Sequence, residues 1–299
     1  MEILLSLWNM MPSTFMISSP ILIAAIGGML CEKAGVVNIA LEGLMVLGAM
    51  TAAVSVSALG LSPVPALLLA ALVGGFFSLA HAFASITLRA DQVISGAGIN
   101  LLALGLTVFV CQLLFRMDRS PPHLGMTRGF LGLFPTVWIA LGLLALASFV
   151  LYRRPWGLRL RAAGESPEAL AAAGVDVVRI RYVAVLLSGL LSGLAGGCVV
   201  LTQDIQFTVT TINGTGFIAL AAVSFGRWLP AGILGSSFLF GLSSALAVNI
   251  VNIRSLRALL PSEFFSAIPY LITLATLIVF SGKDYAPRSV GKPFEDGNG

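Results

Sequence analysis

Long apolar stretches recur along most of the chain, and short polar segments separate them. A helix needs about 20 mainly apolar residues to cross the hydrocarbon core of a bilayer. Stretches near that length occur at 14–30, 36–58, 64–88, 92–115, 132–152, 182–203, 228–251 and 264–281. A shorter one, Ile212 to Phe225, opens with Asn213-Gly-Thr-Gly216, which is typical of a half-helix or broken span. The pattern predicts an all-α, polytopic transmembrane helical bundle of about 8–10 spans, at least one of them short or broken.

The composition supports this prediction. The 299 residues are 58% hydrophobic and only 10% charged, with a mean hydropathy of +0.98, whereas soluble domains carry about 25% charged residues. No polar linker long enough to divide folding units interrupts the stretches between Met11 and Ser281. We therefore expect a single transmembrane domain covering residues 1–299.

The basic residues predict the orientation of the chain in the membrane. Cytoplasmic loops of membrane proteins are enriched in Lys and Arg. The loop between residues 152 and 182 holds six of the 17 basic residues, namely Arg153, Arg154, Arg159, Arg161, Arg179 and Arg181. This predicts a cytoplasmic loop at 153–181, an N-terminus outside the cell and a cytoplasmic C-terminal tail at 282–299. Residues Glu32–Lys33, Arg89–Asp91 and Arg227 should share the cytoplasmic side.

The tail and the small residues carry two further expectations. The composition of residues 283–299, with Pro287, Pro293 and three glycines, predicts a segment that buries no core and is dispensable for folding. Small residues recur at helical spacing in the stretch 182–203, where Ser188, Ser192 and Gly196 accompany Gly189, Gly193 and Gly197. A row of small residues lets the backbones of neighbouring helices approach closely, so we expect close helix packing along the stretch 182–203.

The segment from Arg161 to Gly174 has the signals of a short helix. Ser166 is suited to the N-cap, Pro167 to the first helical position and Gly174 to the left-handed position after the helix. The expected helix has about seven residues and a length of about 10 Å. It is either an ordinary loop helix or a docking element for a cytoplasmic partner.

A second polar constellation surrounds Glu42. Asn38 and Glu42 lie four residues apart, and Gly35 and Gly43 bracket a point where the helix is expected to be interrupted. A carboxylate inside a span is costly, so it finds a partner or faces a cavity. Glu42 is therefore either a structural anchor or a residue of a translocation path. The same alternatives apply to Asn38, Asn100 and Asn213.

Signatures of catalysis and of metal binding are missing from the sequence. It has no H-E-x-x-H motif, no G-x-S-x-G nucleophile elbow and no Walker A loop. Cys31, Cys111 and Cys198 are far apart, which indicates neither a disulfide framework nor a metal cluster. His81 and His123 are expected to be interhelical hydrogen-bonding residues. We expect no catalytic residue, no metal and no cofactor, and if ATP drives the protein, another chain must bind it.

Three motifs together resemble one family. They are the segments Ala34–Gly43, Gly164–Gly174 and Gly216–Trp228. The family is the branched-chain amino acid, ribose and simple-sugar type of ABC-transporter permease, and the combination is most similar to nucleoside-uptake permeases that work with a basic-membrane-protein-type lipoprotein. Ala40 departs from the pattern, because family members often have Gly at this position.

The resemblance implies a transport subunit without enzymatic activity, in the bacterial cell (inner) membrane. Its implied partners are a second permease that completes a heterodimer, a cytoplasmic ATPase with two nucleotide-binding domains, and an extracytoplasmic lipoprotein that binds the solute. The implied ATPase-coupling residues are Gly164, Glu165, Ser166, Pro167, Glu168, Ala169, Ala173 and Gly174.

The substrate remains open at this point. Nucleosides are favoured by the combination of motifs, while simple sugars or branched-chain amino acids are the alternative for the same type of importer. An ion-coupled secondary transporter, in which Glu42 and Asp204 titrate, is a third possibility.

Overall fold

The computed structural model describes residues 2–123, 125–250, 271 and 285–294, and the described part contains helices and loops but no strand. Its helices are α1 (Glu2–Lys33), α2 (Leu41–Ser57), α3 (Pro63–Ala82) with the π-helical turn η1 (Phe83–Thr87), α4 (Gln92–Phe115), the 3₁₀ turn η2 (Phe130–Gly132), α5 (Pro135–Arg153), α6 (Pro155–Glu165), α7 (Pro167–Ala172), α8 (Val177–Thr202), α9 (Thr215–Phe225) and α10 (Pro230–Ile250). Six of the described helices are long and apolar enough to cross a membrane, and α2 and α9 are shorter apolar helices. The all-α helical bundle is confirmed.

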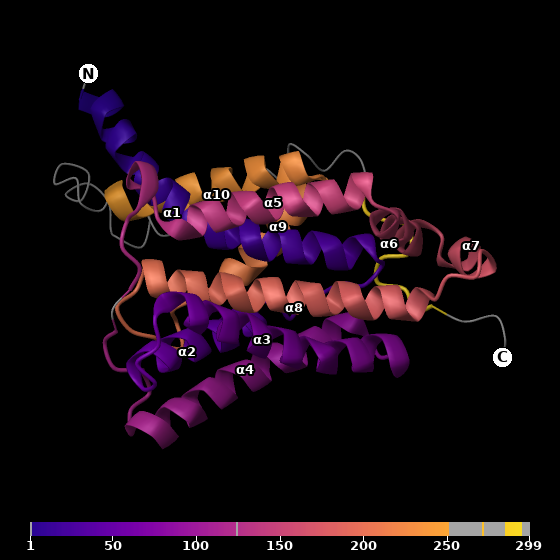
Figure 1. Ribbon diagram of the computed structural model, residues 1–299, viewed down its shortest axis with the longest axis horizontal. Coiled ribbons are helices and arrows are strands. Elements are labelled where there is room, and N and C mark those ends of the chain that lie inside the picture. Colours follow the sequence, from indigo (N-terminus) through magenta and orange to yellow (C-terminus); the bar gives the residue numbers. More distant parts are fainter. Residues whose placement is uncertain (1, 124, 251–270, 272–284, 295–299) are drawn as a thin grey trace.

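Helix α1 is the central element of the bundle. Figure 1 shows it between α5 and α10 on one side and α8, α2 and α3 on the other. The helix packs against α8, α10, α9 and α5, so Ile23, Ala24 and Ala25 are fully buried. A helix that is apolar on every face belongs in the interior of a large bundle. Helix α4, by contrast, buries only a narrow stripe and exposes Ile94, Leu101 and Leu113.

Close backbone contacts hold α8 against α2 and α3, as the small residues predict. A methyl group on Gly196 would overlap the carbonyl oxygen of Met45, and one on Gly193 would overlap the carbonyl oxygen of Ala70. Gly48 and Gly74 contact the backbone of Gly193 in the same way. Glycine is therefore required at these crossings, because any side chain would push the helices apart.

Two expected boundaries need correction, and one expected side-chain cap is not formed. The stretch 36–58 is helical only from Leu41, because residues 34–40 leave the helical conformation. The loop 153–181 contains α6 as well as the expected short helix, which is α7 and has six residues. Ser166 occupies the N-cap position of α7, but its side chain makes no capping hydrogen bond. The expected span 264–281 lies outside the described residues except for Leu271.

The tail also differs from expectation, because residues 285–294 fold back onto the bundle (Figure 1). Pro287 and Ser289 are buried, and Ser289 bonds to the end of α6. The guanidinium of Arg227 lies 4.6 Å from the centroid of the Tyr285 ring. The tail, Arg227 and the arginine-rich loop therefore lie at the same end of the bundle, which we call the arginine-rich end.

The glycine contacts of α8 lead to a first prediction. The substitution Gly196→Ala inserts a methyl group against the carbonyl of Met45, and such overpacking costs about 1–3 kcal/mol. We expect a lower midpoint of thermal unfolding and less monodisperse protein after detergent extraction. The control is Gly142→Ala in α5, where the added methyl group meets nothing within 4 Å. Equal tolerance of both substitutions would contradict the assignment of α8 as a closely packed helix.

Candidate functional site

The break between α1 and α2 is the most polar part of the bundle interior. Helix α1 ends at Lys33 and α2 begins at Leu41, and the intervening segment 34–40 contains Gly35 in a left-handed conformation (φ +90°). Non-helical backbone at membrane depth must find hydrogen-bond partners inside the protein, because lipid supplies none. The partners of this segment therefore decide whether the break is stable.

Side chains from α3 and α4 satisfy the backbone of Val37. Its N–H donates to Oε1 of Gln92 at 2.7 Å, and its carbonyl oxygen lies 3.0 Å from Nε2 of His81. The other ring nitrogen of His81 lies 3.0 Å from the hydroxyl of Ser95. His81 is thus an interhelical hydrogen-bonding residue, as expected, and the described residues contain no cluster suited to a metal ion.

Two asparagines hold the rest of the break. The side-chain amide of Asn38 donates to the hydroxyl of Ser188 at 2.9 Å, and its oxygen accepts from the N–H of Ala40 at 3.1 Å. Asn100 on α4 donates to the carbonyl of Ile39 at 3.0 Å and accepts from the N–H of Gly43 at 2.8 Å. Both ends of each amide are bonded to the chain itself. In this conformation neither amide has a free end for a solute.

Glu42 joins the break to the start of α9. One carboxylate oxygen accepts from the N–H of Gly214 at 2.7 Å, and the other accepts from the N–H of Gly216 at 2.7 Å. The first N–H groups of a helix have no partner within the helix and carry partial positive charge. The carboxylate thus caps α9 from a helix 172 residues away in sequence.

Helix α9 is the half-helix expected from the sequence. Its 11 residues extend about 16 Å, roughly half of the hydrocarbon core. Asn213 and Gly214 precede it with φ values of +43° and +85°, which turn the chain into the helix. Gly216 has no space for a side chain, because a Cβ atom would lie 2.5 Å from the backbone of Glu42.

Asn213 differs from the other three predicted site residues. Its side chain is exposed, as is that of Phe217 one turn further along α9. Asn38, Glu42 and Asn100 are instead bonded around the break. The structure therefore brings three of the four residues into one cluster and leaves Asn213 at its edge.

The predicted coupling residues lie at the arginine-rich end. Gly164 and Pro167 are buried, as is Leu170, so one face of α7 packs on the chain itself. The remaining predicted residues are exposed, and they are Glu165, Ser166, Glu168, Ala169, Ala173 and Gly174. Gly174 adopts the expected left-handed conformation with φ +77°. Helix α7 thus presents a free face made of small and acidic residues.

Sequence reasoning missed several partners of this site. Gln92 gave no signal and Ser188 was noted only as a small residue for helix packing, because a single amide or hydroxyl in an apolar stretch has many possible uses. Glu32 receives a hydrogen bond from the indole N–H of Trp228, and Arg181 is buried although the arginine count placed it in a solvated loop. Long-range pairs of this kind are visible only once the helices are placed.

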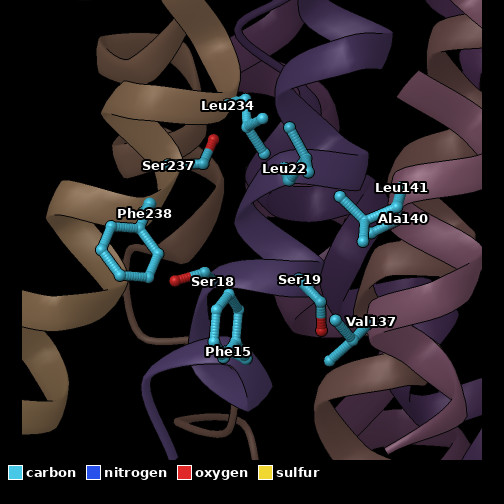
Figure 2. A pocket seen from close by; sticks show the side chains of 10 residues that line it. All are labelled: Phe15, Ser18, Ser19, Leu22, Val137, Ala140, Leu141, Leu234, Ser237 and Phe238. Carbon is cyan, nitrogen blue, oxygen red and sulfur yellow. The ribbon is translucent and has the colours of Figure 1, made fainter. Parts of the chain in front are cut away.

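A small crevice of about 40 Å³ lies between α1, α5 and α10 (Figure 2). Its lining is mostly apolar, with Phe15 and Phe238 on one side and Val137 and Ala140 on the other. The hydroxyl of Ser19 is occupied nearby, because it donates at 3.1 Å to the carbonyl of Met16, which Pro20 leaves without a helical partner. The crevice is separate from the Glu42 cluster and offers few polar groups to a solute.

At the opposite end of the bundle, two connecting segments pair with each other. The N–H of Ser120 donates to the carbonyl of Phe207 at 3.0 Å, and the N–H of His123 donates to that of Ile205 at 2.8 Å. Asp204 directly precedes the paired residue Ile205. Burial raises the pKa of its carboxyl, while a hydrogen bond to Thr211 and the proximity of His123 oppose the rise.

The bonds of Glu42 lead to a second prediction. Glu42→Leu leaves the N–H groups of Gly214 and Gly216 unpaired, at about 1–3 kcal/mol for each group. Glu42→Gln keeps one acceptor oxygen and should be milder. If Glu42 is an anchor, both variants reduce the yield of folded protein and the unfolding midpoint, whereas Gln112→Leu on the exposed face of α4 does not. Full assembly of both variants with background transport would favour the path interpretation instead.

Comparisons with known proteins agree with this architecture. The family described as the branched-chain amino acid transport system permease component matches residues 10–277. The guanosine ABC transporter permease NupQ of Bacillus subtilis (strain 168) is 37% identical over an alignment of 318 positions, gaps included, that covers 99% of each chain. The nucleoside ABC transporter permease NupC of Lactococcus lactis subsp. cremoris (strain MG1363) is 37% identical over 294 residues, 92% of each chain.

A solved ABC transporter in an inward-facing conformation has a similar fold. It aligns with a TM-score of 0.54 and 16% identity over 90% of this chain and 86% of that chain. At this identity the likeness concerns the fold alone. Together with the match over residues 10–277, these findings show that the chain belongs to the family of branched-chain amino acid transport system permease components.

Proposed function

We propose that this chain is the nucleoside-conducting permease subunit of an ATP-driven importer in the bacterial cell (inner) membrane. The observation that carries the proposal is its similarity, over more than nine-tenths of its length, to two permeases named for guanosine and nucleoside transport. The substrate class is transferred from these relatives. Residues 1–299 form a single permease domain in this proposal, and the chain itself catalyses no reaction.

The importer would contain three further components. A second, related permease forms a heterodimer with this chain, a cytoplasmic ATPase with two nucleotide-binding domains drives transport, and an extracytoplasmic lipoprotein delivers the nucleoside. The exposed face of α7 supports the docking of the ATPase. It is small and free, while Pro167 and Leu170 fix the opposite face of the helix to the bundle. A force on α7 would therefore reach the membrane helices.

The arginine-rich end is cytoplasmic in this proposal. The loop 153–181, Arg227 and the described tail residues lie together at this end, and such an excess of arginine is typical of the cytoplasmic side. With this orientation the C-terminus is cytoplasmic and the N-terminus lies outside.

Asn38, Glu42 and Asn100 act as structural anchors of the translocation machinery in this proposal. All of their polar groups are bonded within the chain. Asn213 is the better candidate for contact with the solute, because its side chain is exposed, as is the ring of Phe217 in the first turn of α9. An amide can hydrogen-bond a base or a ribose, and an aromatic ring can stack on a base.

The proposed substrate is tested with the complete transporter in proteoliposomes. Radiolabelled guanosine is supplied together with the binding protein and ATP, and competition by unlabelled nucleosides, sugars and branched-chain amino acids is measured. We expect ATP-dependent uptake that excess nucleosides abolish and that sugars and amino acids leave unchanged. Uptake blocked by a sugar or an amino acid, or uptake that requires an ion gradient in place of ATP, would refute the proposed function.

The docking surface is tested on Ala172, which is exposed, because the neighbouring Ala171 packs partly on the bundle. Ala172→Glu places a carboxylate where the ATPase is expected to cover a methyl group, and burial of an unpaired charge is strongly unfavourable. We expect ATPase binding to weaken by at least about tenfold, or about 1.4 kcal/mol, with normal membrane insertion. The control is Ala90→Glu, an exposed alanine between η1 and α4. Unchanged co-purification of the ATPase with Ala172→Glu would contradict docking at α7.

A further inference from the structure

The C-terminal segment 285–294 binds to the ends of helices that are distant in the sequence. The hydroxyl of Ser289 donates to the carbonyl of Gly164 at 2.6 Å and lies 3.2 Å from that of Ala163. The N–H of Ser289 donates to the carbonyl of Gly164 at 2.9 Å. The last carbonyl groups of a helix have no partner within the helix. Ser289 therefore supplies the C-terminal cap of α6.

The same segment also binds to the end of α1. The N–H of Gly291 donates to the carbonyl of Gly35 at 3.2 Å. Gly164 of α6 lies directly against the carbonyl of Lys33, with no space for a side chain between them. The ends of α1 and α6 are thus in backbone contact, and the turn around Ser289 spans both. Figure 1 shows the described tail in yellow, beside α6 and the start of α8.

Arg181 on α8 completes the cluster. It is only 2% exposed, and its guanidinium donates from Nε to the carbonyl of Ala34 at 3.2 Å and from Nη1 to that of Lys292 at 3.1 Å. The ring of Phe294 lies 5.9 Å from the guanidinium carbon. A buried charge is tolerated only where it is compensated. Here the carbonyls of Ala34, just after the end of α1, and of Lys292 in the tail accept its hydrogen bonds, while its second terminal nitrogen, Nη2, is buried without a hydrogen-bond partner.

The coupling helix begins next to this cluster. Helix α7 starts at Pro167, two residues after α6 ends at Glu165, and its Glu168 carboxylate attracts the charge of Arg181. Movement of α7 therefore acts on the end of α6. Through the hydrogen bonds of Ser289 and Arg181, it also acts on segment 285–294 and the end of α1. Segment 285–294 bonds both to Gly164 at the end of α6 and to Gly35 after the end of α1, so it links these two helix ends. The end of α1 continues through residues 34–40 to Glu42 and the capped end of α9.

We propose that residues 285–294 form a C-terminal latch that positions the coupling helix α7 by joining the ends of α1, α6 and α8 around Arg181, with Ser289 and Arg181 as its positioning residues. This inference rests on the proposed function, in which α7 receives the force of the ATPase. The latch passes that force to α1 and to the break at residues 34–40. Its hydrogen bonds reach helix ends that are distant in the sequence, and Phe294 also packs against the apolar core.

The test compares Ser289→Ala and Arg181→Met with the wild type in the complete transporter. A control variant, Lys292→Ala, changes the same segment but keeps the backbone carbonyl that Arg181 binds. Radiolabelled guanosine uptake and ATP hydrolysis are measured on the same proteoliposomes. We expect both latch variants to lower the amount of guanosine imported per ATP hydrolysed several-fold, while ATP hydrolysis itself continues. The Lys292→Ala variant should match the wild type.

A second measurement separates the latch from the substrate assignment. Hydrogen–deuterium exchange of the full-length chain in its complex, without solute, should be faster in residues 166–174 of Ser289→Ala than in those of Lys292→Ala. Failure of the wild type to import guanosine would refute the proposed substrate but leave this comparison valid. The latch is refuted if exchange in 166–174 is unchanged, or if folded latch variants import as much guanosine per ATP as the wild type.

Discussion

In the proposed function, the interior of this permease depends on the hydrogen bonds between the Glu42 carboxylate and the first N–H groups of α9. A helix that starts at membrane depth exposes N–H groups that neither water nor lipid can satisfy. The carboxylate supplies both acceptors and the negative charge that the helix end favours. The backbone of the adjacent break, residues 34–40, is hydrogen-bonded in turn by the side chains of Asn38, Asn100, Gln92 and His81. These hydrogen bonds connect the break at residues 34–40 with the start of α9, and we call this connected region the Glu42 junction.

This junction explains why polar residues lie in an otherwise apolar bundle. Asn38, Glu42, His81, Gln92 and Asn100 each form at least one hydrogen bond with backbone that is not helical. The result is a fixed point inside the bundle, while α4 and the face of α9 that carries Phe217 remain exposed. At the arginine-rich end, Arg181 donates a hydrogen bond to the carbonyl of Ala34 just after α1, and Ser289 donates one to the carbonyl of Gly164 at the end of α6. Both clusters use polar groups to hold helix ends in place.

Much of the fold follows from the sequence, because bilayer thickness fixes the length of a span and the spacing of glycines marks close contacts. The broken start of α9 and the interruption before α2 are equally local signals, carried by Gly214, Gly216 and Gly35. The sequence did not reveal which groups satisfy these breaks, since Glu42 and Gly214 are 172 residues apart. The docking of the tail was missed for another reason. Composition predicts whether a segment buries apolar surface, but Ser289 is held by hydrogen bonds to helix ends.

The central claim is that the Glu42 junction stays intact while the rest of the transporter moves. Structures of the assembled complex with and without bound ATP test it most directly, through the distances from the Glu42 carboxylate to the N–H groups of Gly214 and Gly216. The account predicts that both distances stay near the present 2.7 Å in each state, although α7 changes position. A carboxylate that leaves α9 in either state, or that contacts the transported solute, would contradict the account.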